Sequence, residues 1–121
     1  MLDMSPSRTH AKIHFAVCVV LSKHYGELEW LIDYDLKTND KEFVRPDIIA
    51  LEDAEPHTAI EISMTTLKYD QKAKLGIYES LNIPHYIIVD CHNNRIQKFS
   101  LVDDEYKPSD CYPELDDKIF D

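Results

Sequence analysis

The chain has 121 residues, 44% of them hydrophobic, and its 23 acidic and 13 basic side chains give a formal net charge of -10. This length supplies one ordinary core and excludes a second large domain, and the negative charge excludes nucleic-acid binding by the surface as a whole, so any such role must come from a local site. Cys18, Cys91 and Cys111 form no C-x-x-C pair, which excludes a cysteine-rich zinc module and suits a reducing compartment.

The first predicted element is a helix over residues 8–24. Ser7 or Thr9 is a plausible N-cap, apolar residues recur at helical spacing, and the pattern stops before Gly26. Its apolar run, residues 15–21, is too short to span a bilayer and is not followed by a small-residue cleavage site. We therefore expect a cytoplasmic protein without a membrane partner, with a signal peptide as the second interpretation.

Strands are predicted next. Residues 27–36 are rich in β-branched and aromatic types and lead into a polar turn at 37–41. Residues 46–51 and 58–63 predict two further strands, separated by the charged, proline-containing segment 52–56, which is expected to be unable to continue a central ladder.

The second half of the chain predicts a helix and a hairpin. Thr66 is a good N-cap for a helix over 66–81, which Asn82 and Pro84 end. Residues 85–90 predict a buried strand and 95–101 its hairpin partner. The predicted order is α-β-β-β-α-β-β. The acidic tail from residue 103 carries apolar residues that could dock back onto the body, namely Leu115, Ile119 and Phe120.

Two carboxylates stand in the apolar strand segments. Asp47 follows Arg45-Pro46, and Glu61 lies in the run Ala59-Ile60-Glu61-Ile62-Ser63. An unpaired buried charge is costly and usually requires a cation or a metal. Neighbouring strands lie about 4.8 Å apart, so two such carboxylates can converge on one Mg²⁺, which prefers oxygen ligands.

A lysine on the second predicted helix completes the candidate site. Asp70, Lys74 and Tyr78 are spaced four residues apart, so they share one helix face. Lys74 could hold or polarise an attacking water. The alternative is that Glu61 and Lys74 form a structural ion pair while Asp47 closes a turn, and Tyr78 is more typical of a core aromatic than of a catalytic acid.

Two histidines one turn apart on the first helix, His10 and His14, could be metal ligands. With no third partner identified, a solvated or hydrogen-bonded pair is the favoured interpretation, and zinc is not predicted.

Several motifs, in a fixed order along the chain, resemble those of a known protein family. They are Arg45-Pro46-Asp47-Ile48, Glu61-Ile62-Ser63, Tyr69-Asp70 with Lys74-Leu75 and Tyr78, and Asn82-Ile83-Pro84 before the strand that ends in Val89-Asp90. This set resembles the Uma-two (Uma2) family, described as restriction-endonuclease-like proteins of the PD-(D/E)xK nuclease superfamily. The likeness covers nearly the whole chain.

The resemblance implies a single α/β domain over 1–121 with a restriction-endonuclease-like mixed β-sheet core flanked by helices. It implies an Mg²⁺-dependent endonuclease, with Mn²⁺ as a possible substitute, that hydrolyses DNA and works as a homodimer. Asp47 and Glu61 carry over as metal ligands, Lys74 as the catalytic lysine, and Ser63, Asp70 and Tyr78 as supporting residues.

Departures from the family pattern bear on activity. Ser63 stands where the superfamily commonly has its lysine, Met64 where an acidic residue is frequent, and Ile87 where an aromatic residue is usual. We also expect the chain to lack the usual N-terminal strand pair and its glutamate.

These departures leave two alternatives to the nuclease. The first is an inactive binding or regulatory module on the nuclease scaffold. The second is an oligomeric scaffold that associates through the first helix and residues 27–36.

Overall fold

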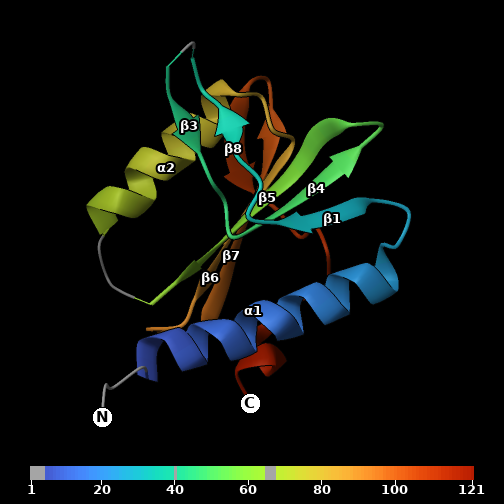
Figure 1. The fold of residues 1–121 in the computed structure, drawn as a ribbon, viewed down its shortest axis with the longest axis vertical. Helices are drawn as coiled ribbons and strands as arrows, with labels where there is room; N and C mark the ends of the chain where they lie inside the picture. Colours follow the sequence, from blue (N-terminus) through green and yellow to red (C-terminus); the bar gives the residue numbers. More distant parts are fainter. Residues whose placement is uncertain (1–4, 40, 65–67) are drawn as a thin grey trace.

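The computed structural model describes residues 5–39, 41–64 and 68–121 and shows a sheet between two helices (Figure 1). Helix α1 (Ser5–His24) covers one face of the sheet, and α2 (Lys68–Ser80) covers the other. The predicted α/β class with a restriction-endonuclease-like core is confirmed.

Six strands form the sheet, in the order β1-β4-β5-β6-β7-β8. Their bounds are β1 Glu29–Ile32, β4 Ile48–Glu52, β5 Glu55–Ser63, β6 His85–Asp90, β7 Arg95–Val102 and β8 Glu105–Pro108. All neighbouring pairs are antiparallel except β5 and β6, which are parallel. Helix α2 makes the crossover that a parallel pair requires.

The two faces of the sheet carry separate cores because side chains alternate along each strand. On the α1 face, Val17 and Leu21 pack with Ile60 and Ile87, all fully buried. On the α2 face, buried Tyr78 and Tyr86 pack with Ile49 and Ala59. The strands near the centre of the sheet are therefore apolar on both sides, which makes any polar residue within them noteworthy.

The structure adds short strands that the sequence did not predict. Asp33 adopts a left-handed φ of 55°, which ends β1, so the predicted strand 27–36 is divided. Strand β2 (Leu36–Lys37) instead pairs with β3 (Phe43–Val44) in a small hairpin. Strand β8 was missed because four residues with two charges carry little periodic signal.

The expectation that 52–56 cannot continue a ladder was wrong. Glu55 and Pro56 belong to β5, and Pro56 pairs with Leu51. The register shifts between Ala50 and Leu51, so His57 is an extra residue, and proline is tolerated beside such a bulge. Asp53 and Ala54 form the two-residue turn, with φ values of 51° and 69°.

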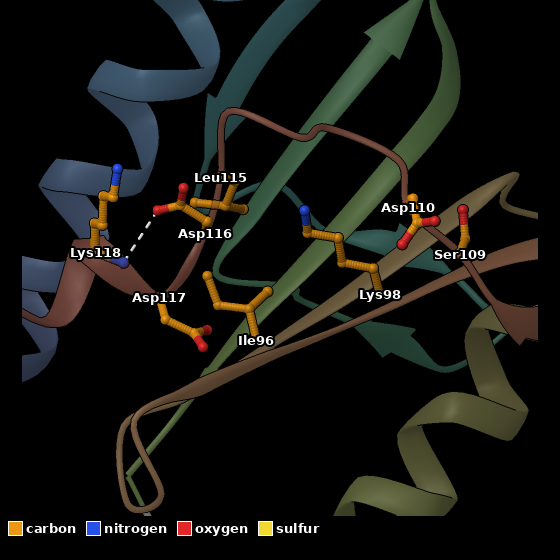
Figure 2. Close-up of a pocket in the computed structure, with 8 residues that line it drawn as sticks. All are labelled: Ile96, Lys98, Ser109, Asp110, Leu115, Asp116, Asp117 and Lys118. Atoms are coloured by element: carbon orange, nitrogen blue, oxygen red, sulfur yellow. Dashed lines mark hydrogen bonds between the residues drawn. The ribbon is translucent and has the colours of Figure 1, made fainter.

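The acidic tail docks on the body as predicted. Leu115 is fully buried, and Ile119 and Phe120, in the short helix η1 (Asp117–Phe120), pack partly against the α1-side core. The tail passes over β7 beside an open cavity of about 450 Å³. Figure 2 shows the residues that line this cavity. Lys98, on β7, donates from Nζ to the Tyr112 carbonyl oxygen at 2.8 Å and so ties the tail down.

Candidate active site

Asp47 lies in a bend directly before β4. Its register places it opposite the end of β5, because Ile48 pairs with Ile60. Asp47 Oδ2 accepts a hydrogen bond from the Ile62 amide at 2.7 Å, so the carboxylate is fixed to the backbone of β5. Its side chain is 28% exposed and can still reach solvent.

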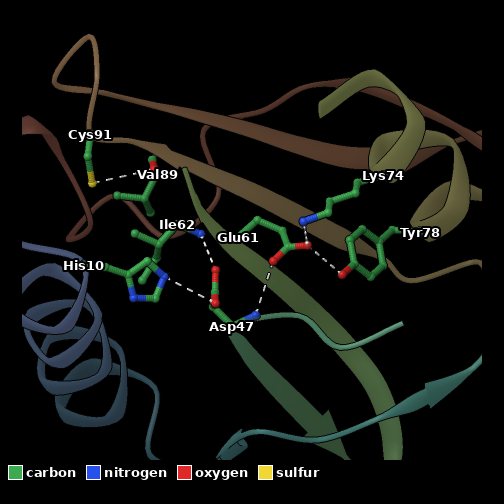
Figure 3. A network of polar contacts seen from close by, with 8 residues as sticks. All are labelled: His10, Asp47, Glu61, Ile62, Lys74, Tyr78, Val89 and Cys91. Carbon is green, nitrogen blue, oxygen red and sulfur yellow. Dashed lines mark hydrogen bonds and ion pairs between the residues drawn. The ribbon is translucent and has the colours of Figure 1, made fainter. Parts of the chain in front are cut away.

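Glu61 sits near the end of β5 with a side chain only 9% exposed. Glu61 Oε1 accepts from the Asp47 amide at 3.3 Å, which brings the second acid against the first (Figure 3). A carboxylate this buried needs partners, because desolvation penalises its charged form.

Helix α2 supplies these partners. Lys74 Nζ lies 3.2 Å from Glu61 Oε2, and the buried Tyr78 hydroxyl donates to the same oxygen at 3.0 Å (Figure 3). Their spacing of four residues puts both on the face that packs over β5. The structure thus brings Asp47, Glu61, Lys74 and Tyr78 together, and Tyr78 is both a core aromatic and a hydrogen-bond donor to Glu61.

The pKa of Glu61 is raised above its ordinary value. Burial is the largest cause; Lys74 opposes the shift, and the negative charge of Asp47 reinforces it. Burial also raises the pKa of Tyr78, and its bond to Glu61 adds to the effect, so Tyr78 remains a donor. Like charges side by side with one lysine make a site where a further cation would be stabilised.

His10 joins the site from α1, which sequence reasoning missed. Its Nε2 lies 3.4 Å from Asp47 Oδ1 (Figure 3). One turn later His14 packs edge-on against it with ring centroids 5.7 Å apart, and His14 Nε2 is buried without a hydrogen-bond partner among the described residues. Helical spacing showed that the two rings are neighbours, but only the packing of α1 against the sheet reveals the contact with Asp47.

The structure describes the side chain of the predicted supporting residue Ser63 but not that of Asp70. Ser63 Oγ accepts a hydrogen bond from Gln71 Nε2 at 3.1 Å. A cavity of about 160 Å³ opens beside Glu61, lined further by Ile62, Ser63, Met64, Gln71, Lys74, Tyr86 and Ile88. Asp70 belongs to α2, but its side chain lies outside the described residues, as does the predicted N-cap Thr66.

A family model described as "Uma2: Putative restriction endonuclease" matches residues 1–119. The chain belongs to the Uma2 family. The resemblance drawn from the motifs is confirmed, and the family is one of nuclease-type proteins, for which DNA is the expected partner. No curated protein matches the sequence. Neither α1 nor α2, the α-helices of the described residues, is long and apolar enough to cross a bilayer.

The residues of this Uma2 chain fit a magnesium ion better than zinc. Asp47 and Glu61 offer hard carboxylate oxygens, and Mg²⁺ commonly uses one or two carboxylates while keeping several waters. A structural zinc site uses four protein ligands. Within the described ranges, no three or more His, Cys, Asp or Glu side chains gather closely enough to hold a metal.

Proposed function

We propose that this Uma2 protein hydrolyses DNA phosphodiester bonds as a Mg²⁺-dependent endonuclease, with Mn²⁺ as a substitute. The observation that carries the proposal is the convergence of Asp47, in the bend before β4, and Glu61, on the paired strand β5, with Lys74 from the adjoining helix. Three residues far apart in the sequence meet at one end of the sheet, where two of them extend into solvent.

The two carboxylates would hold the ion, which when bound neutralises phosphate charge and lowers the pKa of a coordinated water. Asp47 is held in place by the Ile62 amide, and Glu61 by Tyr78. Preorganised ligands of this kind need little rearrangement when substrate arrives.

Lys74 would act on the attacking water and on the developing negative charge. Its side chain is 37% exposed, so the ammonium group can contact Glu61 and a solvent molecule together. His10, beside Asp47 on the other side, would position that carboxylate. Lys74 compensates part of the negative charge of the acids, which otherwise repels phosphate.

The local charge supports DNA as the partner despite the net charge of -10. The contact of His10 with Asp47 places the first turns of α1 at the site end of the sheet, and the pairing of Asp90 with Arg95 places the start of β7 there too. Exposed basic residues occupy these segments and the first half of α2, namely Arg8, Lys12, Lys72 and Arg95. Such residues can neutralise phosphates flanking the site.

Nicking of supercoiled plasmid in Mg²⁺ tests the proposal. Glu61→Gln should abolish nicking while the circular dichroism spectrum stays unchanged, because the substitution keeps shape and removes the charge. Glu55→Gln, at an exposed glutamate on the same strand, is the matched control and should keep cleaving. Equal nicking by Glu61→Gln and the parent protein would refute the assignment.

An inactive binding module on the same scaffold is the second candidate. Glu61 already has Lys74, Tyr78 and the Asp47 amide as partners, which a purely structural ion pair would also show. Calorimetric titration with Mg²⁺ separates the two, since a metal site binds the ion and a structural pair does not. The homodimer and the cytoplasmic location remain predictions, which light scattering and cell fractionation would test.

A further inference from the structure

Another cavity, of about 210 Å³, lies at the other end of β5 from Glu61. Four ring side chains form much of its wall: Tyr25, His57, His85 and Tyr112. Leu28, Cys111 and two exposed carboxylates, Glu27 and Glu52, complete the lining. The nuclease site uses none of these residues.

Hydrogen bonds hold the rings in place. The fully buried Thr58 hydroxyl contacts the Tyr112 hydroxyl and lies 2.8 Å from His57 Nδ1. His85 Nδ1 lies 2.7 Å from Ser100 Oγ on the neighbouring strand β7. With both Nδ1 atoms occupied, each imidazole has a fixed orientation, and the two ring centroids are 5.0 Å apart.

Tyr112 reaches the cavity through a costly backbone conformation. Its φ is 52°, in the left-handed region that a bulky residue rarely adopts, at a cost of about 1–2 kcal/mol. Its ring packs edge-on to Tyr25, with centroids 4.6 Å apart, and also contacts Trp30 and His85. Backbone strain of this kind tends to occur at ligand-binding sites.

The cavity is electrostatically negative. Burial raises the pKa of Tyr112 to about 12, and the carboxylates of Glu27 and Glu52 line the same cavity as its ring. Among the described residues that line the cavity, neither lysine nor arginine occurs. Aromatic faces together with carboxylates form the environment that attracts an alkylammonium group.

We propose that this cavity binds an organic cation, an alkylammonium group carried by a small molecule or by a modified lysine side chain. The rings of Tyr25 and Tyr112 would contact the cation, while Glu27 and Glu52 at the mouth would attract it and balance its charge.

Fluorescence of Trp30 gives a direct readout. It is the chain's single tryptophan, and its ring centroid is 6.0 Å from that of Tyr112. Tetramethylammonium and N-acetyl-trimethyllysine amide should each change the emission with saturation below about 10 mM, and the tighter of the two assigns the source of the cation. Neopentyl alcohol, of similar size and without charge, should cause no saturable change.

Variants locate the binding. Glu27→Gln with Glu52→Gln should weaken tetramethylammonium binding about fivefold to tenfold, whereas Glu55→Gln, an exposed glutamate outside the cavity, should not. Tyr25→Phe keeps an aromatic face and should retain binding, while Tyr25→Leu should lose it with an unchanged circular dichroism spectrum. Failure of both cations to bind, equal binding of neopentyl alcohol, or tight binding of Zn²⁺ that these variants abolish would each overturn the proposal.

Discussion

The two ends of β5 bury polar groups in different ways. At the Glu61 end, the buried Glu61 carboxylate meets the Lys74 ammonium group, and His10 lies beside Asp47. At the His57 end, the buried groups are hydroxyls and imidazoles joined by hydrogen bonds through Thr58 and Ser100. In a charged network, each buried charge must be compensated by its partner. A neutral network needs only complete hydrogen bonding.

The largest loss of stability should come from removing a charged partner at the Glu61 end of β5. Lys74→Met leaves Glu61 buried without its cation and should lower the free energy of unfolding by about 2 kcal/mol, less than for a fully buried pair because Lys74 is 37% exposed. Urea denaturation measures this. Adding Glu61→Gln should restore much of the loss; if the double variant is as unstable as the sum of the two single ones, the pair contributes no coupling.

A substitution in the hydrogen-bond network at the His57 end should reduce stability less. Thr58→Val keeps the shape of a fully buried side chain but leaves His57 Nδ1 and the Tyr112 hydroxyl with only their mutual contact at 3.3 Å. We expect a loss of about 1–2 kcal/mol in the same measurement. Thr9→Val, at an exposed position on α1, is the control. An unchanged midpoint for Thr58→Val would contradict the network.

Lowering the pH should destabilise the protein through His85, which lies at the His57 end of β5. Burial, helped by His57, lowers the pKa of His85 in the folded protein, so the unfolded chain takes up the proton more readily. Stability due to this group should fall as the pH drops below the unfolded value of about 6.5. Thermal unfolding should show a shallower pH dependence in His85→Gln than in the parent protein. His24→Gln, at an exposed site, should keep the parent slope.

The smallest change in stability should come from an exposed ion pair that lies at neither end of β5. Arg45 and Asp35 form a two-bond contact at 2.7 and 3.2 Å, but both side chains are about half exposed. Solvent screens such a pair, so Asp35→Asn should leave the urea midpoint unchanged within error. A clear shift would mean that surface charges matter as much as the buried ones.

Sequence patterns predicted the fold where burial is continuous. The apolar runs at 46–51, 58–63 and 85–90 became β4, β5 and β6, because near-central strands are covered on both faces. Patterns failed at β2, β3 and β8, which are too short to show a period. The bulge at His57 was also missed, since it depends on the register with β4.

The sequence predicted those residues of the candidate site whose burial is energetically unfavourable without a partner. Asp47 and Glu61 stand out because acids within apolar strands need partners, and Lys74 follows from helical spacing. The contact of His10 with Asp47 depends on how α1 crosses the sheet, which no local pattern encodes. The aromatic cavity was missed for the same reason, since Tyr112 meets Thr58 from 54 residues away.

The turns of this molecule are made almost without glycine. Asp53-Ala54 and Asp103-Asp104 adopt left-handed conformations with φ values from 51° to 69°, and the whole chain contains two glycines. Each such residue raises the energy of the native state, by about 1 kcal/mol for alanine. A change such as Ala54→Gly, in the β4–β5 turn, would relieve one of these conformations and is therefore a route to a more heat-stable protein.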